Sequence, residues 1–298
     1  DNRAGQWQVV RPSKFARRIT PNTPAKVAGP ATGSALMKSA LHADGIDAHG
    51  VLNNCANGYT PWGTYLTCDE NFSFYFVNQS GSIPAEQKRY NINEKGLGYR
   101  WHEFDERFDA AKHPHEPNQF GWVTEIDPFD PQSAPVKRTA LGRLKHEGAM
   151  TVIAPDGRVV VYMGDDERFE YVYKFVSRER FNAKDRHSNF GLLDHGTLYV
   201  ARYDAEGKGT WLPLVAGQGG LTAAAGFPDQ ASVCVKTRQA ADIAGATKMD
   251  RPERVAVHPV SGDVYVTLTN NEDRGKEGKP GPNLANPRAQ NIYGHILH

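Results

Sequence analysis

Acidic and amide side chains gather in five short segments of this chain, and such side chains could bind a metal ion. The segments are residues 68–71 (CDEN), 145–148 (KHEG), 164–167 (GDDE), 249–253 (MDRPE) and 269–273 (TNNED). Taken singly, acid runs of this kind are most often solvated turns. Each segment lies at the end of an expected strand, so we expect their side chains to meet at one mouth of a β fold. Carboxylate and amide oxygens are the ligands that Ca²⁺ prefers, in sets of about 6–8.

A cysteine, Cys68, stands directly before two acids in the first of these segments. A thiolate there suits a softer, transition-type metal. A cation between the thiol and the carboxylates would deprotonate the thiol and offset the repulsion from Asp69 and Glu70. A disulfide between Cys68 and Cys55 fits the spacing equally well. Cys234 alternates with valines in ASVCVKT, which predicts a buried strand residue.

Arg251 is the cation most suited to binding an anionic substrate. Its guanidinium fork matches phosphate in a bidentate way, although a surface ion pair with Asp250 or Glu253 is equally compatible with the sequence. Lys145 and His146 offer a second positive or donor group. An anion held by arginine and polarised by several cations is typical of phosphoryl transfer, in which the protein mainly positions groups and neutralises charge.

Several common catalytic motifs are absent from the sequence. It contains no GxxxxGK[ST] phosphate loop, no GxSxG elbow, no HExxH and no paired CxxC. His113 and His115 in KHPHEP could form a metal pair, but a Pro-rich loop more often exposes such side chains to solvent.

The elements that must position these groups are short strands closed by turns. Segments 151–167 and 255–272 resemble each other, each with an apolar strand, a turn containing Pro and Gly, a Val/Tyr strand and a polar cluster. This repeat favours a β-propeller over a β-sandwich. Residues 1–45 are predicted to form an N-terminal extension with one short helix in 29–43, and residues 46–298 the propeller blades. Short helices are expected within 86–95 and 239–248.

Composition excludes several classes of protein. Lys and Arg number 35 against 34 Asp and Glu, so no net field recruits nucleic acid or a membrane surface. No apolar run approaches the about 20 residues of a membrane span. Three cysteines are too few for a disulfide scaffold, and the opening DNRAGQWQVV does not read as a signal peptide.

Long ordered motifs resemble the PhoX-type alkaline phosphatases from about residue 20 to the C-terminus. They include NNCANGYTPWGTYLTCDENF, GWVTEIDPFDPQSAPVKRTALGRLKHEGA, VVVYMGDDERFEYVYKFVS, MDRPERVAVHP and NPRAQNIYGHI. The resemblance implies an all-β, six-bladed β-propeller exported through the twin-arginine route, and thus a secreted or periplasmic protein. It also implies hydrolysis of small phosphomonoesters at a central cluster of iron and calcium, with a cysteine as iron ligand.

Roles follow from the resemblance, motif by motif. Cys68 in TCDEN is similar to the iron ligand, and Arg251 in MDRPE to the phosphate-binding arginine. The other residues that the resemblance implies as metal ligands are acids or amides: Asp69, Glu70, Glu147, Asp166, Glu167 and Glu253, with Asp250 and Asn270 as further candidates.

Two departures from the family pattern lead to further expectations. The motif is TCDEN where TCEEN is expected in many relatives, so the shorter Asp69 would require an adjusted geometry. Sequences of the family continue beyond YGHI. We therefore expect this chain to form an incomplete propeller, which the missing part or a second chain completes. The sequence does not decide whether this chain is active by itself.

Two other functions fit parts of the pattern. A calcium-dependent propeller lactonase or phosphotriesterase would use similar oxygen ligands but would not need Cys68 or Arg251. A non-catalytic calcium-binding propeller would bind calcium without turnover.

Overall fold

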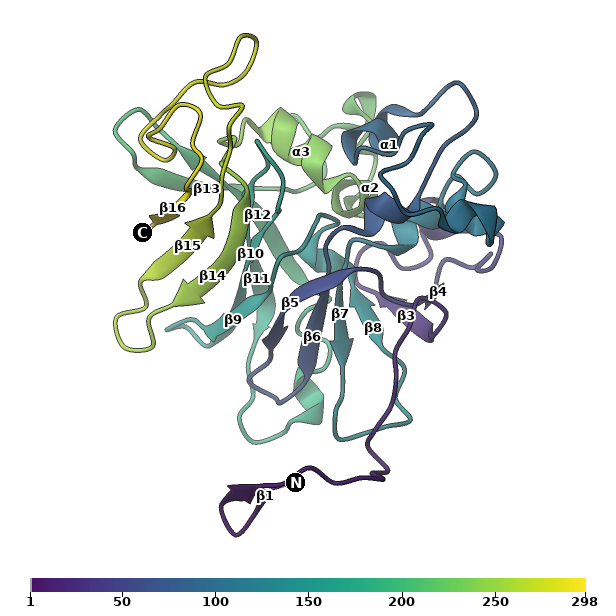
Figure 1. The fold of residues 1–298 in the computed structure, drawn as a ribbon. Coiled ribbons are helices and arrows are strands. Elements are labelled where there is room, and N and C mark those ends of the chain that lie inside the picture. Colours follow the sequence, from purple (N-terminus) through teal and green to yellow (C-terminus); the bar gives the residue numbers. More distant parts are fainter. Residues whose placement is uncertain (1) are drawn as a thin grey trace.

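The structure, a computed structural model, describes residues 2–298 and consists mainly of β-sheet (Figure 1). The largest sheet has the strand order β4 (Asp47–His49), β3 (Pro24–Ala28), β8 (Val136–Arg138), β7 (Val123–Ile126), β6 (Tyr65–Asp69) and β5 (Asn54–Tyr59). A five-stranded sheet has the order β13 (Gly209–Pro213), β12 (Gly196–Tyr203), β11 (Val172–Arg180), β10 (Arg158–Gly164) and β9 (Met150–Ile153). A third sheet has the order β14 (Pro252–Val257), β15 (Val264–Leu268) and β16 (His295–Leu297), and β1 (Asn2–Arg3) pairs with β2 (Gln6–Trp7).

Helices are few and short, which confirms the expected all-β class. The α-helices are α1 (Ala85–Arg89), α2 (Gln230–Val235) and α3 (Thr237–Ala244). Single turns of 3₁₀ helix occur at η1 (Ala35–Met37), η2 (Phe72–Tyr75), η3 (Trp101–Glu103), η4 (Glu106–Phe108), η5 (Glu116–Gln119), η6 (Thr139–Leu141), η7 (His187–Asn189) and η8 (Ala223–Ala225). Within residues 2–298, no helix combines the length and the hydropathy of a membrane span.

The two similar segments of the sequence each form an antiparallel hairpin, as their turns predict. β9 and β10 are joined through Gly157, whose φ of +88° suits glycine. β14 and β15 are joined through Gly262 at φ +78°. The alternating residues Val159, Val161 and Met163 of β10 are buried in the largest hydrophobic cluster.

Three local predictions differ from the structure. Cys234 is buried but lies in α2, because Asp229 and Ser232 form a capping box that begins a helix there. The helix expected in 29–43 is only the 3₁₀ turn η1. The boundary predicted at residue 45 falls inside the largest sheet, where β3 pairs with β8 in parallel and with β4 antiparallel.

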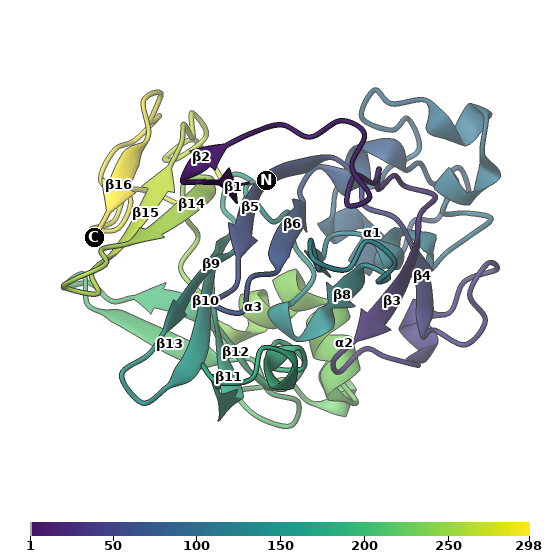
Figure 2. The same ribbon diagram turned by 90° about the horizontal axis from the view of Figure 1, so that it is seen from below.

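At the edges of the three large sheets, β9 lies against both β5 and β14 (Figure 2). Glycines allow this close approach. A Cβ on Gly58 of β5 would lie 1.9 Å from the carbonyl oxygen of Ala149, and a Cβ on Gly164 of β10 would lie 2.2 Å from that of Glu253. Side chains at the ends of these strands are therefore brought together from distant parts of the sequence.

Candidate metal centre

Five side chains from these strand ends form a compact group with the chemistry of metal ligands. Cys55, Glu70 and Glu147 have ligand atoms within 4.8 Å of one another, and so do Glu147, Asp166 and Glu253. Glu147 belongs to both sets, so they form one continuous cluster, named here the acidic cluster. The carboxylates of Glu70, Glu147 and Asp166 are buried, whereas Glu253 is half-buried and Cys55 is the more exposed end.

β-bulges place two members of the acidic cluster. The pairing of β5 with β6 shifts between Asn54 and Asn57, and Cys55 lies in this shift. The pairing of β14 with β15 shifts between Pro252 and Val255, and Glu253 lies in that one. Bulges commonly re-aim side chains beside functional sites.

Left-handed backbone precedes both bulges. Asn53 has φ +49° and stands two residues before Cys55, and Arg251 has φ +36° and stands two residues before Glu253. For a long side chain such as arginine this conformation is unfavourable, and such strain concentrates at functional sites.

Backbone hydrogen bonds position Glu70 and Glu147. Glu70 directly follows β6, and its N–H donates to the carbonyl of Asn53 at 3.2 Å. The N–H of Glu147 donates to Gly164 at 3.3 Å, and its carbonyl accepts from Ala56 at 2.9 Å. The contacts of Glu147 connect the largest sheet to the five-stranded sheet at the acidic cluster.

Burial and mutual repulsion disfavour the charged forms of several side chains in the acidic cluster. Burial, with Asp166 and Glu147 nearby, raises the pKa of Glu70 to about 8. Burial and Asp166 also raise the pKa of Glu253. Burial and the contact with Glu147, whose Oε1 lies 3.5 Å from Sγ, raise the pKa of Cys55 to about 12. A cation would relieve each of these effects, so the donor set fits a metal site that takes both thiolate and carboxylate ligands.

Arg251 closes one side of the acidic cluster. Its Nε and Nη2 donate to the two carboxylate oxygens of Asp166 at 2.9 and 2.8 Å, and Nη2 lies 3.5 Å from Glu253. Its Nη1 donates to Asn270 at 3.2 Å. Burial alone would lower the pKa of Arg251, but the hydrogen bonds and charge of Asp166 raise it above its ordinary value. Its main partner is thus not Asp250, which pairs with Arg274.

A cavity of about 600 Å³ opens on the acidic cluster and is named here the site cavity. Its lining combines acids, cations and two aromatic rings: Glu70, Asn71, Phe74, Lys145, Asp166, Glu167, Arg168, Phe169, Arg251, Asp273 and Lys279.

Cys68 and Asp69, predicted as ligands, do not join the acidic cluster. Cys68 is fully buried in the hydrophobic cluster with Leu66 and Val123, and burial raises the pKa of its thiol. Asp69 is buried and accepts from the backbone N–H groups of Leu52 at 3.0 Å and Gly121 at 3.2 Å. Burial raises the pKa of Asp69. All three cysteines are free, so the alternative Cys55–Cys68 disulfide is not formed.

The other predicted ligands have other partners. Glu167 forms an ion pair with Lys145 at 2.9 Å. Asp250 accepts from Asn271 at 2.9 Å and pairs with the buried Arg274. Asn270 accepts a hydrogen bond from Nη1 of Arg251.

The residue that the sequence analysis missed is Cys55, which it considered only as a disulfide partner. The available signal was its position at the start of a strand, in a segment that also resembles the PhoX-type phosphatases.

Comparisons with known proteins agree with this chemistry. The family model described as alkaline phosphatase PhoX matches residues 1–298. The structure is similar to that of Pseudomonas fluorescens PhoX in complex with vanadate, a transition state analogue, with a TM-score of 0.94 and 52% sequence identity. The match covers 99% of this chain and 52% of that chain, so this chain spans about half the length of its relative. No curated protein matches it.

Proposed function

This chain belongs to the PhoX alkaline phosphatase family, and we propose that it hydrolyses small phosphomonoesters and releases inorganic phosphate at the acidic cluster. One observation carries the proposal: a thiol and four carboxylates from three sheets converge in the acidic cluster, and Glu70, Asp166 and Arg251 line the site cavity beside it. The relative's binding of vanadate, a transition state analogue, supports a phosphoryl-transfer reaction.

Iron and calcium are the proposed metals. Cys55, Glu70 and Glu147 offer a thiolate beside carboxylates, which suits iron. Glu147, Asp166 and Glu253 offer only oxygen ligands, which suit calcium. When bound, such cations neutralise charge on the phosphoryl group. Cys55 thus replaces Cys68 as the proposed iron ligand.

Arg251 orients the phosphate ester in this proposal. Asp166 holds the Nε and Nη2 edge of the guanidinium, which fixes the plane of the group. The Nη1 edge contacts the neutral amide of Asn270, and Arg251 lines the site cavity, so this edge remains suited to donate to a phosphate oxygen. The negative charge of the carboxylates around Arg251 repels anions unless cations are bound.

We further propose that the three large sheets are blades of a six-bladed propeller and that the protein is exported. The antiparallel meanders β5–β8, β9–β13 and β14–β16, whose first strands lie near one another at one site, support the propeller. Export follows the resemblance to the PhoX-type phosphatases.

The test combines metal analysis with phosphate release from a generic aryl phosphate. We expect iron and calcium in the purified protein, together with turnover. Arg251→Ala should keep the metals but lower kcat/KM by about 10²-fold or more, while Arg100→Ala, which alters an exposed arginine paired with Glu103, should not. Calcium binding without turnover would overturn the proposal in favour of a binding protein, and turnover of lactones or phosphotriesters alone would favour the other enzyme class.

A further inference from the structure

Lys145 lines the site cavity although its side chain is almost fully buried, with 3% of its surface exposed. Its stem is enclosed, and its Nζ lies 4.9 Å from the centre of the Phe74 ring. A lysine with a buried stem beside a cavity is placed to offer its ammonium group to a ligand in that cavity.

Only part of the hydrogen-bonding capacity of Lys145 is used inside the protein. Its Nζ forms an ion pair with Glu167 Oε2 at 2.9 Å, and across residues 2–298 no second carboxylate pairs with it. An ammonium group has three N–H donors. Further donors therefore remain for a ligand in the site cavity.

A network of hydrogen bonds holds Glu167, and through it Lys145, in place. Asn91 Nδ2 donates to Glu167 Oε1 at 2.6 Å, and Arg238 Nη1 donates to Oε2 at 3.2 Å. Arg238 is 1% exposed, and its Nε donates to Asp165 Oδ2 at 2.8 Å. Glu167 Oε2 is therefore shared between Lys145 and Arg238, which fixes its position beside the Lys145 ammonium group.

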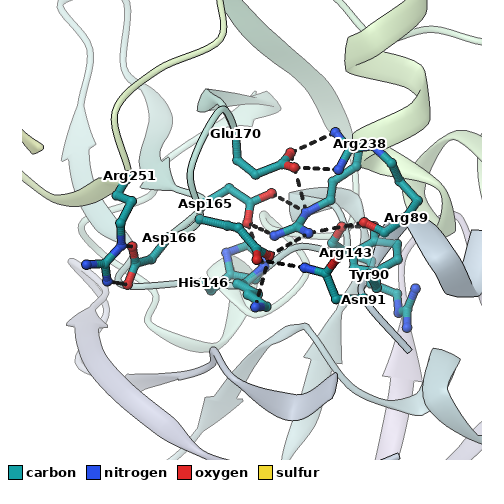
Figure 3. A network of polar contacts seen from close by, with 12 residues as sticks. Arg89, Tyr90, Asn91, Arg143, His146, Asp165, Asp166, Glu170, Arg238 and Arg251 are labelled. Atoms are coloured by element: carbon teal, nitrogen blue, oxygen red, sulfur yellow. Dashed lines mark hydrogen bonds and ion pairs between the residues drawn. The ribbon is translucent and has the colours of Figure 1, made fainter. Parts of the chain in front are cut away.

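The turn after β10 holds one arginine through each of two adjacent aspartates. Figure 3 shows Asp165 directed toward Arg238 and the adjacent Asp166 directed toward Arg251. The backbone of Lys145 is bonded to the same turn: its N–H donates to Asp165 Oδ1 and its carbonyl accepts from the N–H of Asp166, both at 3.1 Å. Arg251 and Lys145 are therefore fixed relative to each other by one short segment.

We propose that Lys145 is a second catalytic cation, which donates to a phosphoryl oxygen of the substrate in the site cavity, and that Glu167 and Arg238 are positioning residues for it. This rests on the proposed function. In phosphoryl transfer, negative charge is spread over three equatorial oxygens, and cations fixed in advance stabilise it. Arg251 supplies a planar fork, and Lys145 supplies a compact point charge.

The experiment compares Lys145→Gln, Lys145→Arg and Glu167→Gln with the unaltered protein, all loaded with metal. Lys184→Gln, at an exposed lysine outside the site, is the matched control. Metal content, kcat and KM for an aryl phosphate, and inhibition by inorganic phosphate are measured for each. A second readout that needs no turnover is the Kd of inorganic phosphate by calorimetry.

We expect Lys145→Gln to retain its metals, to lose about 10²-fold in kcat/KM and to bind inorganic phosphate more weakly. Lys145→Arg should restore part of both losses, and Glu167→Gln should show a smaller loss of the same kind. Unchanged kcat/KM and phosphate Kd in Lys145→Gln would overturn the inference, as would loss of metal in that variant, since Lys145 would then act on the cluster.

Failure of this inference is distinct from failure of the proposed function. If the unaltered protein releases no phosphate, the proposed function fails, and the Kd of inorganic phosphate in Lys145→Gln still decides whether Lys145 contacts the anion. Should Lys145→Gln not fold, Glu167→Gln and Lys145→Arg supply the same comparison of phosphate Kd.

Discussion

Cys55 and Cys68 lie on the paired strands β5 and β6, yet their thiols have different surroundings. Cys55 is in a bulge and lies 3.5 Å from Glu147, whereas Cys68 is packed among apolar side chains. A thiolate is stable only beside a cation or a strong donor, so the two positions differ in their capacity to bind a metal.

The same substitution at the two cysteines should therefore have opposite effects. Cys55→Ser should lose iron with little change in stability, because its side chain is partly exposed. Cys68→Ser should keep iron but lower the free energy of unfolding by about 1–3 kcal/mol, because it buries a hydroxyl without a partner. Elemental analysis and urea denaturation check both results. Loss of iron in Cys68→Ser alone would restore Cys68 as the ligand.

Residue types were sufficient to select the segments of the candidate site, and the resemblance to the PhoX-type phosphatases selected the ligands within them. Glu70, Glu147, Asp166 and Glu253 were chosen in this way, and the structure brings them together with Arg251. Glu167 was chosen for the same reason but pairs with Lys145 instead. Adjacent acids in one turn point in different directions, and which of them joins the acidic cluster depends on backbone geometry that composition does not carry.

At the scale of elements, two bulged strands and two close glycine contacts set the geometry of the acidic cluster. The hairpins were predictable because Gly157 and Gly262 stand in local turns. The bulges in β5 and β14 were not, because a bulge is a property of the register between two strands. Cys234 was assigned to a strand because its valine neighbours outweighed a local capping box.

The Gly164→Ala variant tests the role of the close glycine contact between β10 and β14. In Gly164→Ala the new Cβ would lie 2.2 Å from the carbonyl oxygen of Glu253 and 2.7 Å from that of Pro252, so β14 must move. Because Glu253 and Asp166 lie on either side of this contact, we expect weaker metal binding as well as a lower midpoint of unfolding. Gly281→Ala is the control, since no atom lies within 4 Å of the position that its new methyl group would occupy. Equal calcium affinity in Gly164→Ala and the unaltered protein would contradict this account.

At the scale of the whole molecule, the acidic cluster joins three sheets that do not share one hydrophobic cluster. The largest sheet and the five-stranded sheet share the biggest cluster, whereas Val266 and Leu268 of β15 pack in another with Val172 and Ala201 of the five-stranded sheet. Cys55, Glu147 and Glu253 come from these different parts of the fold. A cation bound among them would therefore stabilise the folded molecule by linking its sheets as well as by relieving repulsion.

Glu147 gives the sharpest test of this coupling, because it belongs to both ligand sets. Calcium at 100 times its Kd should stabilise the unaltered protein by about 2.7 kcal/mol relative to the chelated form. Glu147→Gln should gain much less from calcium, because it loses a ligand shared by both sets. In chelator, however, the variant should be the more stable of the two, because one of the mutually repelling carboxylates is gone. Thermal unfolding of both proteins, with and without calcium, measures this reversal of order. If the variant is the less stable protein under both conditions, Glu147 supports the fold by packing and not through a cation.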